Sequence, residues 1–214
     1  MKSIAFLVGV LAVAAPFHGS QRSSDSKATS ATPVCTSTVD DAAIYSIALR
    51  QTVLKGRDES TEVVLYSQTS AGLPPGLASS SYTSPVERQG LDSATEPATK
   101  KDFDARATLQ CDLATGIEPV GRVTLVTARE KNRIFNPGGT FWKGFNQKYP
   151  HVAGFTLLSA IGFNEQHNQA LLYVGNSCNV LCGSGYLVLL EKKHDKWAAA
   201  KTAVIWTAGP ASNE

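Results

Sequence analysis

Histidine is scarce in this sequence, and the motifs that usually carry catalysis are missing. The chain has only four histidines among 214 residues. It contains no His-Glu-x-x-His pair, no Gly-x-Ser-x-Gly elbow and no glycine loop of the kind that cradles phosphate. The sequence therefore favours a protein that is not an enzyme. It predicts no catalytic residues, no cofactor and no metal site, and it leaves the partner unknown.

A basic stripe with interleaved aromatic residues is also not evident. The 20 basic and 18 acidic residues give a net charge of +2, and we read them as mixed along the chain. Nucleic-acid binding needs a concentrated positive surface. The charge pattern therefore argues against a nucleic-acid partner.

The longest apolar run lies near the N-terminus and is too short to span a membrane. It extends from Ile4 to Ala15 after the positive Lys2, and Ala12-Val13-Ala14 offers a small-x-small cleavage site. A membrane-spanning helix needs about 20 apolar residues, so the run indicates a signal peptide. We predict a signal peptide over residues 1–20 and export to the periplasm or the outside of the cell. We expect no transmembrane segment in the mature chain.

Composition then divides the remaining chain. A segment rich in Ser, Thr, Lys and Asp predicts a disordered leader over residues 21–37. The apolar patterns that follow predict a single α+β domain over residues 38–208, with a flexible tail over 209–214. Thr38-Val39-Asp40-Asp41 is a helix-start signal with two carboxylates in the first turn.

Hydrophobic periodicity predicts helices in the first half of this domain and strands in the second. The expected elements are a helix from residue 39 to about 54, a strand over 61–67, a long loop over 68–92, a helix within 94–110, a strand over 122–127, a helix over 128–135 and an aromatic helix from 141 to 149.

Four apolar runs follow in the C-terminal part, separated by short turns. They cover residues 155–163, 169–177, 185–192 and 197–207. Short connections join antiparallel neighbours, whereas parallel strands need long crossovers. We therefore predict an α+β fold with helices packed on an antiparallel sheet that ends in a four-stranded C-terminal meander. One form of it is a cone-like, curved sheet, as in nuclear-transport-factor-like or cystatin-like folds.

The four cysteines indicate disulfides, because export makes oxidation the default. We favour the pairs Cys178–Cys182 and Cys35–Cys111, with the first closing a β-hairpin. We expect Gly183 and Gly185 to supply positive φ angles there. A redox dithiol and a zinc site are the alternatives for these thiols, but redox motifs favour a two-residue spacer and structural zinc needs four ligands.

Aromatic side chains mark the candidate pocket. If a cavity lies between the sheet and the aromatic helix, we expect Trp142, Tyr149, Tyr173 and Tyr186 to line it. The competing interpretation is that the aromatic stripe is ordinary core.

Reactive side chains elsewhere have simpler explanations. We interpret His167 and His194 as solvated loop residues, and Asp102 with Asp104 as a solvated polar stretch. Two functions remain: an exported non-catalytic module with a structural or interaction role, and a small-molecule-binding or enzymatic domain.

A resemblance covers about a third of the chain. WKGFNQKYPHVAGFTLLSAIGFN and then QALLYVGNSCNVLCGSGYLVLLEKKHDKWAAAKTAVIW run from Trp142 to Trp206. This stretch resembles a group of uncharacterised exported bacterial proteins with a Gly-Phe-Asn segment, an Ala-Leu-x-Tyr-Val strand, a Cys/Gly-rich turn and a Lys-Trp turn. The resemblance implies no known activity. Ala198, Ala199 and Ala200 make the last strand unusually rich in alanine.

Overall fold

The order of helices and strands agrees in outline with the expected pattern. The computed structural model describes residues 35–36, 38–71, 85–113, 116–119, 122–136 and 138–208. The described residues belong to one compact unit. The predicted signal peptide, most of the predicted leader and the tail lie outside the described residues.

Five helices are present in the described part of the chain. They are α1 (Val39–Gln51), α2 (Pro85–Ala94), α3 (Pro97–Arg106), α4 (Ala128–Phe135) and α5 (Phe141–Lys148). The strands are β1 (Cys35–Thr36), β2 (Glu62–Tyr66), β3 (Cys111–Asp112), β4 (Val123–Val126), β5 (Val152–Leu158), β6 (Gly162–Phe163), β7 (Gln169–Asn179), β8 (Cys182–Lys193) and β9 (Lys196–Ala208).

The main sheet is mixed, with the order β4-β2-β5-β7-β8-β9 and β6 beside β7. Its C-terminal strands β5, β7, β8 and β9 pair antiparallel in succession, so the predicted meander is confirmed. However, β2 pairs parallel with both β4 and β5, and the prediction of a wholly antiparallel sheet was wrong. The connections through α2–α3 and α4–α5 are long enough for parallel crossovers, whereas the short C-terminal connections join antiparallel strands as expected. The sheet has two edges and is not closed.

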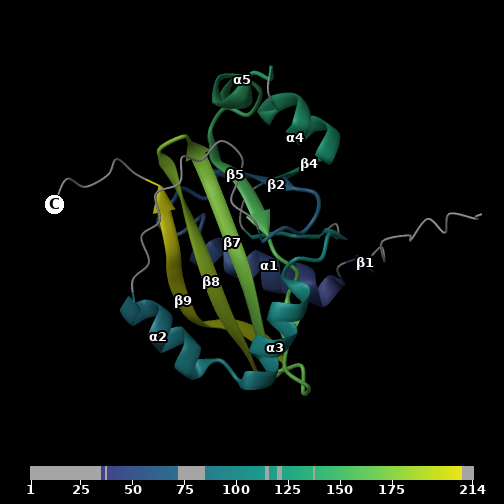
Figure 1. Ribbon diagram of the computed structural model, residues 1–214, viewed down its shortest axis with the longest axis vertical. Helices are drawn as coiled ribbons and strands as arrows, with labels where there is room; N and C mark the ends of the chain where they lie inside the picture. The colour runs from purple at the N-terminus through teal and green to yellow at the C-terminus, as the bar shows by residue number, and fades with distance from the viewer. Residues whose placement is uncertain are drawn as a thin grey trace, which may run out of the picture. The chain divides into compact units, whose positions relative to one another are not determined.

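Helices cover both faces of this sheet (Figure 1). One face packs on α1, and that core includes Ile44, Leu49, Val63, Leu172 and Val188. The opposite face carries two separate clusters, one under α4 and α5 and one under α2 and α3. Alternating residues of the same strands supply both faces, because successive side chains of a strand point in opposite directions.

The predicted start of α1 is confirmed in detail. Thr38 Oγ1 accepts a hydrogen bond from Asp41 N at 3.2 Å, and Thr38 N donates to Asp41 Oδ2 at 2.9 Å. This reciprocal pair is a capping box, which satisfies two backbone donors that the helix itself cannot. Asp40 lies beside it in the first turn, where a negative charge faces the positive end of the helix dipole.

One helix falls in the segment expected to be a loop. The sequence predicts loop over 68–92, but α2 occupies Pro85–Ala94 and buries Leu91 against the sheet. Pro85 at the first helical position has a suitable φ, and its missing N–H is not needed there. The nearby Pro and Ser residues suggested a loop, whereas the contact of Leu91 with the sheet stabilises a helix.

The cysteine turn is a hairpin, as predicted, but its glycines act differently. Asn179 pairs with Cys182, which leaves Val180 and Leu181 as the turn. Neither Gly183 nor Gly185 has positive φ, so the expected backbone role was wrong. Gly185 instead leaves room for the indole of Trp206, whose nitrogen occupies the place of a Cβ.

Candidate functional site

The four aromatic residues expected to line one pocket lie in different places. Trp142 belongs to the cluster under α4 and α5, and Tyr149 packs against that cluster from outside. Tyr173 belongs to the cluster under α2 and α3. Tyr186 packs on the opposite face of the sheet, with the α1 core. The structure therefore places Trp142 and Tyr149 against the same ring, that of Phe145, and does not bring the four together.

The space between the aromatic helix and the sheet is filled by side chains. Phe135 contacts the rings of Trp142, Phe145 and Phe155 at centroid distances of 5.1, 5.8 and 5.3 Å. Phe145 is fully buried, and Trp142 is only 6% exposed. Contacts of this kind are typical of a packed aromatic core. Within the described residues, Trp142 Nε1 is a buried nitrogen without a hydrogen-bond partner.

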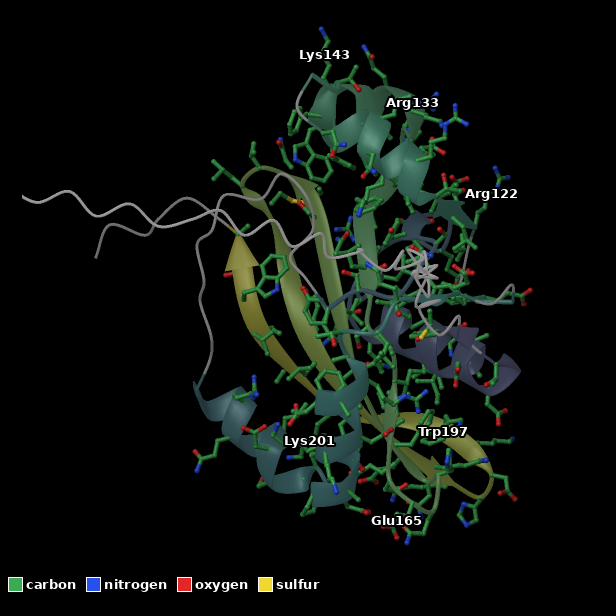
Figure 2. The ribbon with its side chains drawn as sticks, turned by 45° about the vertical axis from the view of Figure 1, so that its right-hand side comes forward. Arg122, Arg133, Lys143, Glu165, Trp197 and Lys201 are labelled. Atoms are coloured by element: carbon green, nitrogen blue, oxygen red, sulfur yellow. A yellow bond between two sulfur atoms is a disulfide. The ribbon has the colours of Figure 1, made fainter. Side chains whose placement is uncertain are left out.

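A groove lies elsewhere, at the end of the sheet where β6 turns into β7 and β8 into β9. It consists of two adjoining hollows of about 380 and 350 Å³, both lined by Arg106, Phe163 and His167. The first hollow continues along α3, and the second extends to Trp197 and the start of α1. We call the two together the hairpin groove. Figure 2 shows Trp197 and Glu165 at this end of the molecule.

Backbone contacts position the centre of the groove. The Phe163 N–H donates to Asp102 Oδ2 at 2.8 Å, and Arg106 Nη1 lies 3.5 Å from the same oxygen. A Cβ at Gly162 would overlap the backbone of Phe103, so only glycine lets α3 approach β6 this closely. Asp102 is therefore a structural anchor, which corrects the expectation of a merely solvated residue.

Three rings form one wall of the hairpin groove. The Phe163 and His167 rings stack at 4.9 Å with an interplanar angle of 24°, and Phe163 lies 6.1 Å from the ring of Trp197. Lys192 Nζ lies 5.8 Å from the Trp197 ring centroid, within the range of a cation–π contact. His167 adopts φ 51° in the β6–β7 turn, a left-handed conformation that is uncommon for residues other than glycine. His167 is exposed as expected, but it is part of this wall.

A buried amide network supports the turn beneath this wall. Asn164 Oδ1 accepts hydrogen bonds from the backbone N–H groups of Asn168 and Gln169, both at 3.0 Å. Gln169 Oε1 accepts from Glu96 N at 2.7 Å and from Thr99 Oγ1 at 2.9 Å. The amide oxygens of Asn164 and Gln169 thus already have hydrogen-bond partners, and these bonds connect the α2–α3 corner to the hairpin. They stiffen the wall and do not form a reactive centre.

The hairpin groove is lined by charged side chains of both signs. Arg106 and Lys192 line the second hollow together with Asp40 and Asp41 at the start of α1. Asp41 is occupied by the capping box, and Asp102 by Phe163 and Arg106. Arg106 also pairs with Asp102, at 3.5 Å, and it is the one charged side chain that lines both hollows beside the aromatic wall. Such an arrangement is suited to binding through stacking and one charge-assisted hydrogen bond.

The disulfide prediction is confirmed for one pair. Cys178 and Cys182 are bonded, with their Cα atoms 5.2 Å apart, at the tip of the β7–β8 hairpin. Cys111 is disulfide-bonded as well, and it lies opposite Cys35 in the parallel β1–β3 pair. The Cys35–Cys111 bond stays a prediction that peptide mapping without reduction would test.

The groove is not evident from the sequence, because its residues are distant along the chain. Arg106, Phe163 and Trp197 belong to α3, β6 and β9. The available signal was that the 164–168 and 193–196 turns must lie at the same end of a meander. That reasoning would have brought Phe163, His167 and Trp197 together, although not Arg106.

Comparisons with known proteins identify no relative of this chain. No family model matches the chain, and neither the curated proteins nor the solved structures include a match. The resemblance to uncharacterised exported proteins therefore stays a prediction. Two further findings concern only the described ranges: no helix there is long and apolar enough to cross a membrane, and no group of three His, Cys, Asp or Glu side chains is placed to hold a metal ion.

Proposed function

We propose that this protein is an exported, non-catalytic binding module that holds a small ligand in the hairpin groove. The observation that carries the proposal is the aromatic wall of Phe163, His167 and Trp197 with the Arg106 guanidinium beside it. An interaction role agrees with the structural tasks of Asp102 and Asn164, whose polar atoms already have partners. Export is supported by the Cys178–Cys182 disulfide.

The chemistry of the groove indicates the class of ligand. A flat apolar group would stack on the exposed parts of Trp197 and Phe163, as aromatic pairs do at 4.5–7 Å. A carboxylate at one end of that group would accept hydrogen bonds from Arg106, whose planar fork suits a carboxylate. We therefore propose an aromatic or similarly flat organic anion as the ligand, and we place it in this groove because packed rings fill the space under α5.

A matched pair of probes tests this proposal. Naphthoate and naphthamide share the same ring system and differ in charge. We expect naphthoate to bind more tightly, and Arg106→Gln to reduce naphthoate affinity about tenfold, because a charge-assisted hydrogen bond contributes roughly 1.5–3 kcal/mol and the groove is open to water. Naphthamide affinity should be unchanged in Arg106→Gln, and Trp197→Ala should weaken both probes.

Lys196→Gln serves as the control, since Lys196 is the exposed first residue of β9 and does not line the groove. Calorimetry or ligand-observed NMR would supply the affinities. The proposal would be abandoned if Trp197→Ala and Arg106→Gln bound both probes as the unmodified protein does.

We also propose that the sheet curves around α1 in the cone-like manner that the sequence suggested. Support comes from two register shifts between β8 and β9, since bulges bend strands and increase their twist. A crystal structure with a flat C-terminal meander would contradict this part of the proposal.

A further inference from the structure

The excess of positive charge in this protein lies in one segment. Of the 20 basic and 18 acidic residues, six basic and only one acidic lie between Arg122 and Lys148, which leaves 14 basic and 17 acidic for the remaining chain. The segment is therefore strongly positive, whereas the rest of the chain is slightly negative. The expectation that basic and acidic residues are mixed along the chain does not hold for this segment.

The fold displays these cations on the outer side of α4 and α5. Figure 2 shows Arg122, Arg133 and Lys143 projecting outward at the end of the molecule that is remote from Trp197. Arg129, Arg133, Lys143 and Lys148 are exposed. We call the exposed surface of α4 and α5, with Arg122, the basic face.

The one carboxylate within the segment does not neutralise the basic face. Glu130 is half-buried, and it accepts a hydrogen bond from Tyr149 Oη at 2.7 Å. The same oxygen contacts Lys148 Nζ and lies 3.9 Å from Arg133 Nη2. Glu130 is thus shared by two cations. Arg122 Nη1 also lies 3.3 Å from Glu62 Oε1, whereas no acidic side chain among the described residues forms an ion pair with Arg129 or Lys143.

Exposed apolar side chains lie at the same end of the sheet. Phe141 at the start of α5 is 40% exposed, and Val180 and Leu181 at the tip of the β7–β8 hairpin are 48% and 55% exposed. The end of β7 runs beside the start of β5, which follows directly from α5, and Asn176 Nδ2 donates to Ala153 O at 3.0 Å there. Figure 1 shows the β7–β8 turn near α5. The Cys178–Cys182 bond closes this apolar tip.

Cations around exposed apolar groups match the surface of an anionic bilayer. Basic side chains are attracted to lipid phosphates, and Phe or Leu side chains enter the boundary between headgroups and acyl chains. We infer that the basic face, together with the Val180-Leu181 tip, docks the protein on a membrane surface rich in anionic phospholipid. This inference does not rest on the ligand proposed for the hairpin groove, which lies at the other end of the sheet.

Vesicle flotation tests the inference directly. The exported protein would be mixed with vesicles of phosphatidylcholine alone or of phosphatidylcholine with phosphatidylglycerol in equal parts. We expect binding to the anionic vesicles, and weaker binding as salt is added. Each basic residue near such a surface contributes about a fivefold gain in partitioning, so Arg129→Gln with Lys143→Gln should reduce binding roughly 25-fold.

Matched variants distinguish the effect of the basic face on vesicle binding from the effect of positive charge elsewhere on the protein. Lys55→Gln with Lys196→Gln removes two exposed cations elsewhere and should change binding little. Leu181→Ser should weaken binding while leaving its salt dependence intact. All variants share the same N-terminus, so differences among them report on the folded domain, and a melting curve for each checks its folding.

Three results would overturn the inference. They are equal binding to neutral and anionic vesicles, an equal loss in the control pair and the Arg129/Lys143 pair, and binding to heparin or DNA without binding to vesicles. The last result would assign the basic face to a soluble polyanion.

Discussion

Gly185 provides a sharp test of how the sheet is packed. It pairs with Gly175 on β7 and with Trp206 on β9, and the Trp206 indole lies across it. Trp206 Nε1 donates to Tyr173 Oη at 3.0 Å, and both side chains are buried. In Gly185→Ala, the new methyl group would overlap the indole nitrogen. The indole must then move away from the sheet, and its hydrogen bond must lengthen or break.

The expected cost follows from three contributions. Overpacking of a core costs about 1–3 kcal/mol, and loss of one buried hydrogen bond costs about 1 kcal/mol. Replacing glycine by alanine restricts the unfolded chain and returns about 0.4–1 kcal/mol, since Gly185 does not have positive φ. We expect Gly185→Ala to lower the free energy of unfolding by about 1–3 kcal/mol. For a domain of this size, each kcal/mol shifts the melting temperature by about 2–4 °C.

A double-mutant cycle identifies the cause. Trp206→Ala alone should cost about 3–5 kcal/mol, because it empties a large buried site. In that background Gly185→Ala should be neutral, or stabilising by up to about 1 kcal/mol. Urea unfolding followed by circular dichroism supplies the four free energies. An equal cost of Gly185→Ala with and without the indole would refute the steric explanation.

Three further outcomes concern other parts of the fold. Replacing Cys178 and Cys182 by Ser should lower stability by about 2 kcal/mol and keep the far-ultraviolet spectrum, because the closed loop is short; a thermal melt checks this. Thr38→Ala should cost about 1 kcal/mol in urea unfolding through loss of the capping box, whereas Thr38→Ser should cost less. Burial raises the pKa of Tyr173 to about 12. Since the folded pKa lies above the ordinary value near 10, the contribution of Tyr173 to stability is complete below pH 10 and is lost as the pH rises toward 12. Unfolding measured against pH should show this loss, and Tyr173→Phe should remove it.

Local signals were sufficient for much of this fold. The Thr38–Asp41 capping box, the α4 bounds and the meander all depend on interactions between residues close in sequence. The Cys178–Cys182 bond belongs to the same group, because a two-residue turn brings its partners together whatever the remaining chain does. Helix caps, hairpins and alternating burial can be predicted from the sequence, because the residues that interact in them are only a few positions apart along the chain.

Contacts between distant segments were decided only by the tertiary structure. The parallel pairing of β2 with β4 and β5, and the helical state of α2, depend on packing that no local pattern reports. The same holds for the two candidate sites. Arg106 meets Phe163 because α3 packs on β6, and the basic face forms because α4 and α5 place their apolar sides on the sheet and their cations outward. The sequence by itself determined which residues are apolar or charged and which can cap a helix or form a turn. Burial between distant segments decided which of these residues contact one another. The reason is that closing a long loop costs entropy, and it is favourable only when the resulting contacts bury enough apolar surface.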